Sequence, residues 1–294
     1  MTEENAAENR GEAAVIASSG RSAPAVAVDV RDVTRTFEAR SGVVHALSDV
    51  SLQVAAGEFV SLIGPSGCGK STLLRLIADL DQPTSGAIEV FGKPARTARE
   101  GGDYGIAFQQ AGLLPWRSVQ ANIELPLELH GVGKAARRER ARELLDMVGL
   151  AEFAGHQPAQ LSGGMQQRVA IARALAEKPS LLLMDEPFGA LDEMTRERLQ
   201  TELLRIRADT NAAVVFVTHS IPEAVYLSDR VVVMSPRPGR VTEIVPVSLG
   251  RAADRDDDLR EDGQFFDGVA AVREALHSAH GEPVESGGKG VDLR

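Results

Sequence analysis

The stretch Leu161-Ser162-Gly163-Gly164-Met165-Gln166-Gln167-Arg168 (LSGGMQQR) lies between two other segments that have the character of a nucleotide site. Upstream is GPSGCGKST, from Gly64 to Thr72, and downstream is LLLMDEP, from Leu181 to Pro187. A glycine-rich phosphate loop alone indicates only that a protein binds a nucleoside triphosphate. The three segments in this order predict a nucleotide site that is divided between two subunits.

The upstream segment fits the phosphate-loop pattern G-x-x-x-x-G-K-[ST] and lies at a strand-to-helix junction. The apolar run FVSLIG precedes it, and STLLRLIADL follows with apolar residues at helical spacing. Glycines allow a tight curl whose N–H groups point at phosphates, and the helix N-terminus favours an anion. We expect Lys70 to reach the β- and γ-phosphates of ATP and Ser71 to bind Mg²⁺. The predicted loop residues are Gly64, Pro65, Ser66, Gly67, Cys68, Gly69, Lys70, Ser71 and Thr72. The alternative is an accidental glycine-rich turn, and the strand before the loop and the helix after it argue against that alternative.

Composition limits the classes of partner. The 32 basic and 42 acidic residues give a net charge of −10, which argues against broad affinity for nucleic acid or anionic lipid. The single cysteine, Cys68, cannot form an internal disulfide and suits a reducing cytoplasm. No stretch approaches the roughly 20 apolar residues of a membrane span, so a membrane role requires a partner. Residues 1–25 carry acidic residues where a signal peptide needs basic ones, and we expect a disordered, unprocessed tail.

Alternating strand and helix patterns predict an α/β fold. Between Val26 and Phe91 the runs VAVDV, VSLQV and AIEVF are typical of strands, expected in a mixed sheet. The runs FVSLI, LLLMD, AVVFV and VVVM predict buried strands, with helices expected from Ser162 to about Ala176 and from near Glu193. This order indicates a mostly parallel sheet with helices on both faces. Residues 115–178 are predicted to be an inserted helical subdomain.

The predicted domain extends over residues 26–250. The charged run RAADRDDDLRED, residues 251–262, is interpreted as a linker. Phe265, Val269, Val272 and Leu276 then fall on one helical face, so residues up to about 280 should form an amphipathic helix that packs on the body. Residues 281–294 are expected to be a disordered tail.

Two acidic residues and a histidine follow buried strands. Asp185 should emerge at the carboxyl end of its strand beside the phosphate loop, which suits a Mg²⁺ contact, direct or through water. The adjacent Glu186 is the better candidate for a general base that polarises the attacking water, although a surface acid near a helix start would look the same. His219 follows AVVFVT and lies at another strand end. A lone histidine is more often structural or exposed.

With these motifs the chain resembles the ATP-binding subunit of an ABC transporter, from about Val26 to Val247. The resemblance implies a P-loop NTPase fold of the ABC type, with an N-terminal antiparallel β subdomain and an inserted helical subdomain. It also implies a head-to-tail dimer in which Ser162, Gly163 and Gly164 of one subunit close on the γ-phosphate of the ATP bound by the other. Intact motifs on one chain favour a homodimer. Locally, Ser162 could equally be a plain helix N-cap.

The same resemblance assigns further residues. It implies that His219 contacts the γ-phosphate, that Gln109 reaches Mg²⁺ and the attacking water, and that Asp192 lies in a loop that spans the dimer interface. Phe37 matches the aromatic residue that stacks on adenine, but it could equally be a core residue of an early strand.

The implied function is to energise a membrane permease from the cytoplasmic face, as a peripheral subunit, with an extracytoplasmic solute-binding protein as an indirect partner. The stretch FQQAGLLPWRSVQANI, from Phe108 to Ile123, is similar to a loop in importers of nitrate, taurine and aliphatic sulfonates, where it receives a coupling helix of the permease. Trp116 would be an interface aromatic or buried packing. Two alternatives remain: an export ATPase, or a soluble ABC ATPase that acts on ribosomes or DNA. No nucleic acid partner is expected.

Overall fold

The centre of the computed structural model is a six-stranded sheet in the order β10-β9-β3-β8-β7-β6. Residues 25–39, 42–250, 255 and 257–281 are described. Neighbouring strands are parallel, except that β10 pairs antiparallel with β9. The strands are β3 (Phe59–Ile63), β6 (Tyr104–Ala107), β7 (Leu181–Asp185), β8 (Ala213–Val217), β9 (Arg230–Met234) and β10 (Val241–Pro246). Every residue of β3, β7 and β8 is buried, as expected of parallel strands covered on both faces.

A second sheet covers one face of the first and is antiparallel, with the strand order β2-β1-β4-β5. Its strands are β1 (Val26–Ala39), β2 (Gly42–Ala55), β4 (Ser85–Val90) and β5 (Lys93–Pro94), and the helix α2 (Ala95–Glu100) follows it. The expectation of a mixed sheet from the apolar runs is wrong, because β1 and β2 are nearly contiguous in the chain and can pair only as a hairpin. The antiparallel subdomain that the resemblance implied is present.

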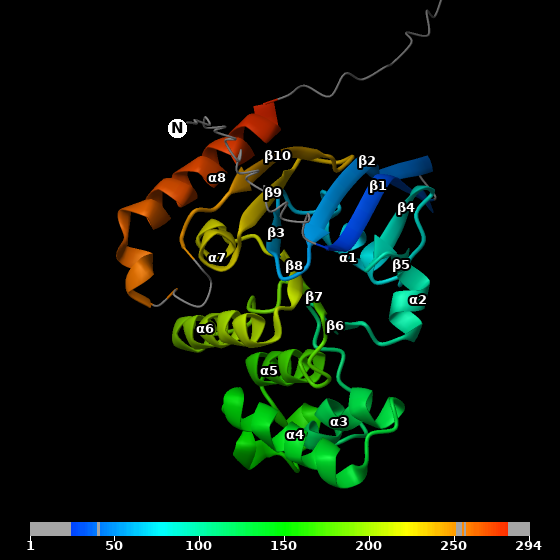
Figure 1. The fold of residues 1–294 in the computed structure, drawn as a ribbon, viewed down its shortest axis with the longest axis vertical. Helices are drawn as coiled ribbons and strands as arrows, with labels where there is room; N and C mark the ends of the chain where they lie inside the picture. Colours follow the sequence, from blue (N-terminus) through cyan, green and yellow to red (C-terminus); the bar gives the residue numbers. More distant parts are fainter. Residues whose placement is uncertain (1–24, 40–41, 251–254, 256, 282–294) are drawn as a thin grey trace, which may run out of the picture.

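The helical subdomain projects away from the central sheet, at the bottom of Figure 1. It contains α3 (Val119–Leu129), α4 (Lys134–Met147) and α5 (Gly163–Ala174), with short 3-10 helices at Ala151–Phe153 and Pro158–Gln160. The basic run of α4 is solvated, while Ala141, Leu144 and Leu145 face the core. One hydrophobic cluster joins this subdomain to the central sheet, so the two are packed together through a continuous core.

The remaining helices pack against the central sheet. They are α1 (Lys70–Ile77), α6 (Glu193–Thr210), α7 (Ile221–Leu227) and α8 (Gly263–Gly281). Figure 1 shows α8 lying across α7, β9 and β10, and its own residues Phe265, Val269 and Val272 are buried on the side that packs against them. Across the described ranges, none of the helices has the length and apolar character to cross a membrane.

The interpretation of residues 251–262 as a linker is wrong for the part of this segment that the structure describes. Arg255 is buried and donates to the backbone oxygens of Tyr226 and Ser228, and Asp257–Glu261 form a 3-10 helix. The physical reason is that the arginine satisfies two carbonyls at the end of α7, a pairing that charge composition does not reveal. The two predicted tails, apart from Ala25 and Gly281, lie outside the described residues.

Candidate nucleotide site

Four parallel strands bring the predicted site residues to one edge of the central sheet. The phosphate loop follows β3, Gln109 follows β6, Asp185 ends β7, and His219 follows β8. Ligands of open α/β sheets bind at this carboxyl edge. Residues separated by more than 150 positions in the chain therefore share one site.

The phosphate loop forms one wall of a cavity of about 360 Å³. The cavity is lined by Phe37, Val44, Ala46, Ser66, Gly67, Gly69, Lys70, Ser71, Thr72, Gln109, Glu186 and Arg237. Gly69 has φ 108°, and a Cβ there would lie 2.6 Å from Leu47 Cδ2, so the curl requires glycine. The Lys70 ammonium donates to the carbonyls of Gly64 at 2.8 Å and Pro65 at 3.0 Å. The loop thus places a buried cation at the cavity floor.

Three predicted loop residues do not line the cavity. Gly64, Pro65 and Cys68 support the loop from behind, and the Cys68 sulfur is buried 3.8 Å from the Lys70 nitrogen. Their contribution is to the shape of the loop.

Ser71 and Asp185 form a pair of oxygen ligands next to the cavity. The Ser71 hydroxyl donates to Asp185 Oδ1 at 2.9 Å. Burial raises the pKa of Asp185, while the hydrogen bond from Ser71 lowers it. A hydroxyl and a carboxylate are ligands that Mg²⁺ accepts, and this cation usually takes only one or two protein carboxylates together with substrate phosphates. The residues present therefore fit a Mg²⁺ site.

Glu186 is the meeting point of the three predicted catalytic residues. Gln109 Nε2 donates to Glu186 Oε2 at 3.1 Å, and His219 Nδ1 lies 3.3 Å from the same oxygen. Glu186 has φ 46°, an unusual backbone conformation for a side chain of this size, and its N–H is held by the Val217 carbonyl at 2.9 Å. Strained residues of this kind cluster at functional sites. The carboxylate faces the cavity with a histidine and an amide beside it.

The LSGG segment lies outside this cavity. Ser162 is the N-cap of α5 and accepts from the Met165 N–H at 3.2 Å, so the simple capping interpretation holds locally. Gly163 and Ser162 are exposed, and an added Cβ on Gly163 would meet no atom within 4 Å. A contact of this helix start with phosphate therefore needs a second molecule.

The comparisons with known proteins agree with this geometry. The sequence profile of the ABC transporter family matches residues 47–189. An uncharacterised ABC transporter ATP-binding protein of Methanocaldococcus jannaschii is 52% identical over 230 residues, which are 78% of this chain and 85% of the relative. The chain belongs to the ABC transporter family.

Further relatives refine the comparison. A taurine import ATP-binding protein of Yersinia pestis is 50% identical over 206 residues, covering 70% of this chain and 80% of that protein. A dimeric ATP-binding cassette solved with ADP and Pi in a post-hydrolysis state is 38% identical, with a TM-score of 0.70, and matches 75% of this chain and 99% of that one. As an ABC cassette, this chain binds ATP and is an ATPase whose hydrolysis is coupled to transport.

Phe37 of the cassette is a cavity residue. Its side chain is 37% exposed and lies beside the phosphate loop, so the core interpretation is wrong. The guanidinium carbon of Arg35 lies 4.4 Å from the ring centroid. The face of the Phe37 ring opposite Arg35 is the one that would stack on the adenine base.

We expect Phe37→Ala to raise the Kd for ATP by about fivefold to tenfold, because one aromatic stack is lost. Phe37→Tyr should stay within about twofold of wild type because it keeps the π-face. Titration with a fluorescent ATP analogue measures both. An unchanged Kd for the alanine variant would remove Phe37 from the adenine site.

Asp192 has a local structural role at the start of α6. It is the N-cap and accepts from the Thr195 N–H at 3.0 Å. The hydrogen bonds with Thr195 hold the pKa of this carboxyl below its usual range. Its place at a dimer interface stays a prediction.

Gly163 offers a test of the divided site that leaves the fold intact. We expect Gly163→Asp to lower kcat at least about tenfold, because a negative side chain would project at the partner's γ-phosphate. The free energy of unfolding should be unchanged or up to about 1 kcal/mol higher, since aspartate suits the first turn of a helix better than glycine.

Phosphate release and thermal unfolding measure the two quantities. The matched control is Gly133→Asp, at the start of α4, where a Cβ also meets no atom within 4 Å. Full activity of the Gly163→Asp variant would show that no phosphate approaches this helix start.

The sequence interpretation missed three cavity residues, of which Val44 and Ala46 are apolar and Arg237 is charged. Arg237 donates to the Gly67 carbonyl at 3.1 Å through Nη2 and lines the cavity. It follows β9, whose carboxyl end lies at the same sheet edge as that of β3. The sequence feature that could have identified Arg237 is its position as a basic residue shortly after a buried parallel strand.

Proposed function

We propose that the chain is the ATP-hydrolysing subunit of an importer for taurine or another small sulfonate-type solute, and that nitrate belongs to the same candidate group. The observation that carries the choice of solute is the similarity to taurine import ATP-binding proteins over most of the cassette. The chain would act as a peripheral subunit on the cytoplasmic face of the membrane. Solute selectivity would reside in the permease and an extracytoplasmic binding protein.

In the proposed mechanism, ATP lies between the phosphate loop of one copy and the LSGG helix start of a second copy. Lys70 and the loop N–H groups hold the phosphates, and Glu186 accepts the proton of the attacking water. Gln109 and His219 orient the water and the γ-phosphate. Mg²⁺ held by Ser71 and Asp185 would offset the negative charge of the phosphates. ATP favours the closed pair of cassettes, and hydrolysis reopens it.

The permease would dock near the loop that contains Trp116. This side chain is 73% exposed, so the alternative of buried packing is wrong. The loop is nevertheless fixed, because the buried Asn122 accepts from the Leu114 N–H at 2.7 Å and donates to the carbonyls of Leu114 and Arg117 at 3.1 Å each. An exposed tryptophan on a pinned loop is a suitable interface anchor.

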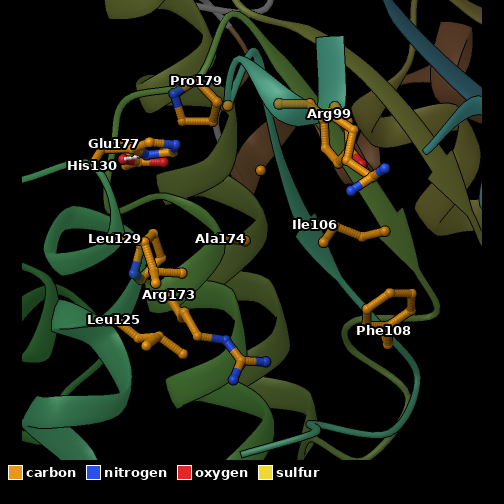
Figure 2. A pocket seen from close by; sticks show the side chains of 14 residues that line it. Arg99, Ile106, Phe108, Leu125, Leu129, His130, Arg173, Ala174, Glu177 and Pro179 are labelled. Atoms are coloured by element: carbon orange, nitrogen blue, oxygen red, sulfur yellow. Dashed lines mark hydrogen bonds and ion pairs between the residues drawn. The ribbon is translucent and has the colours of Figure 1, made fainter. Parts of the chain in front are cut away.

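A groove of about 320 Å³ lies beside this loop, between β6, α3 and the end of α5. Figure 2 shows Ile106, Phe108, Leu125 and Leu129 turned toward it, with Arg173 near its edge. This apolar trough would receive the coupling helix. The helix α5 also binds the chain on both sides of Gln109.

The hydrogen bonds from α5 to the chain around Gln109 connect the groove mechanically to the nucleotide site. Gln167 Nε2 donates to the Phe108 carbonyl at 2.9 Å, and Arg173 Nη2 donates to the Ala111 carbonyl at 2.8 Å. A helix pressed into the groove would therefore displace Gln109 and the LSGG helix together. This is the proposed coupling between permease and hydrolysis.

Trp116→Ala tests the docking surface. We expect the ATPase rate of the isolated cassette to stay within about twofold, and recovery of the permease in a pull-down from mild-detergent membranes to fall at least about tenfold. Phe266→Ala, which removes an aromatic side chain that is 58% exposed on α8, is the control. Unchanged permease recovery would place the docking surface elsewhere.

Solute uptake tests the import function. In cells that lack this chain, uptake of labelled taurine should be lost and should return with the wild-type chain but not with Glu186→Gln. Retained uptake of taurine, other sulfonates and nitrate would overturn the solute assignment. Pull-down of ribosomal or DNA-repair proteins without an integral membrane partner would favour the soluble-ATPase alternative.

A further inference from the structure

The loop that carries His219 is held by a buried carboxylate that the proposed mechanism does not use. Glu223, in α7, is only 7% exposed. Its Oε2 accepts from the Thr218 hydroxyl, and its Oε1 accepts from Gln200 Nε2 at 2.9 Å. Burial raises the pKa of Glu223, while the hydrogen bonds from Thr218 and Gln200 lower it. A polar group buried this deeply destabilises the fold unless its partners compensate for lost water.

Glu223 completes a relayed capping box around His219. Ser220 is the N-cap of α7 and accepts from the Glu223 N–H at 3.4 Å. In an ordinary capping box the glutamate would accept directly from the N-cap N–H. Here the Ser220 N–H donates to Thr218 Oγ1 at 3.0 Å, and Thr218 in turn donates to Glu223. The residues on both sides of His219 are thus tied to one carboxylate.

His219 depends on this backbone anchor. Its side chain is 68% exposed. It contacts Glu186 Oε2 at 3.3 Å, and Glu186 is its proposed partner in the reaction rather than a separate support. The imidazole therefore takes its position mainly from the backbone between Thr218 and Ser220. Loosening either neighbour would move it relative to the γ-phosphate by enough to slow the reaction.

The C-terminal segment fixes the other side of Glu223. Gln200 is 2% exposed, and its Oε1 accepts from Arg260 Nη2 at 2.6 Å. The Arg260 guanidinium carbon lies 3.7 Å from the centroid of the Tyr226 ring. Because arginine can only donate, the Gln200 amide must turn its oxygen to Arg260 and its nitrogen to Glu223. Position 223 must then present an acceptor to Gln200.

We propose that Glu223 is a positioning residue for His219, and that Gln200 and Arg260 fix its orientation from α6 and the C-terminal segment. The inference rests on the proposed role of His219 in hydrolysis. It connects the C-terminal segment, through Arg260, to the rate of the chemical step.

Glu223→Gln is the first test. The glutamine keeps the shape but places an amide N–H against either Thr218 or Gln200. We expect kcat to fall about tenfold while the KM for ATP stays within about twofold, because the phosphate loop is unchanged. The matched control is Glu124→Gln: Glu124 is 8% exposed and also accepts from a glutamine amide and an arginine, but in the helical subdomain. Thr218→Val removes the relaying hydroxyl by an independent route and should give the same loss.

A rescue distinguishes positioning from general stability. In the Glu223→Gln chain, Arg260→Met frees the Gln200 amide to turn and accept from the new amide. We expect the double variant to recover kcat to within about threefold of wild type. A kcat equal to or lower than that of the Glu223→Gln variant would overturn the role of Arg260. Thermal unfolding of each variant checks that the cassette is folded.

Combination with His219→Ala separates this inference from the proposed function. We expect His219→Ala to lower kcat at least about tenfold, and Glu223→Gln to have no further effect in that background. If His219→Ala keeps full activity, the proposed role of His219 fails. If it loses activity and Glu223→Gln lowers kcat by the same factor again, Glu223 does not act through His219 and only this inference is overturned.

Discussion

Glu186→Gln should keep ATP binding and lose turnover, with kcat lowered by about 10²-fold to 10⁴-fold. The amide cannot accept the proton of the attacking water, yet the substitution leaves the phosphate loop itself, and so the groups that hold the phosphates, unchanged. ATP then stays intact, and the closed pair of cassettes should persist. Phosphate release and size-exclusion chromatography with MgATP measure the two effects.

Glu152→Gln, an exposed glutamate of the helical subdomain, is the control for this variant. Its kcat and its elution should match wild type. Fast hydrolysis by the Glu186→Gln chain would remove Glu186 from the role of general base. His219 and Gln109, which both contact its Oε2, would then need another partner in the reaction.

Lys70→Ala should weaken ATP binding strongly, with the Kd raised by about 100-fold or more. Lys70 is 7% exposed and its ammonium is already aligned by two loop carbonyls. Removal leaves these carbonyls without their donor and takes away the charge that meets the β- and γ-phosphates. Isothermal titration calorimetry with ATP measures the loss.

Lys134→Ala, at the exposed start of α4, removes the same charge without touching the cavity and should bind ATP normally. A Kd for the Lys70 variant close to that of Lys134→Ala would mean that ATP does not use this loop.

The sequence predicted those parts of the site whose chemistry depends on contiguous residues. The phosphate loop, Glu186 and His219 follow short apolar strands and Asp185 ends one, and parallel strands bring their carboxyl ends to one edge. The backbone position of these residues is therefore nearly determined once the strands are recognised. The comparisons confirm the ABC fold and the ATPase class.

What the sequence missed depends on side chains that meet across long separations. Arg237 reaches Gly67, and Arg260 reaches Gln200, without any motif at either position. The mixed-sheet expectation failed because strand runs do not specify pairing direction. The linker interpretation failed because a charged run hid Arg255, a buried residue with two carbonyl partners.

The most direct test of the divided site is to mix two chains that are each strongly impaired as homodimers, Lys70→Ala and Gly163→Asp. Each homodimer has two defective sites. A mixed dimer has one site with both defects and one intact site, made of the phosphate loop of the Gly163→Asp chain and the LSGG helix of the Lys70→Ala chain. Random mixing should therefore restore about a quarter of the wild-type ATPase rate. A mixture no faster than its separate components would contradict a site shared between two copies.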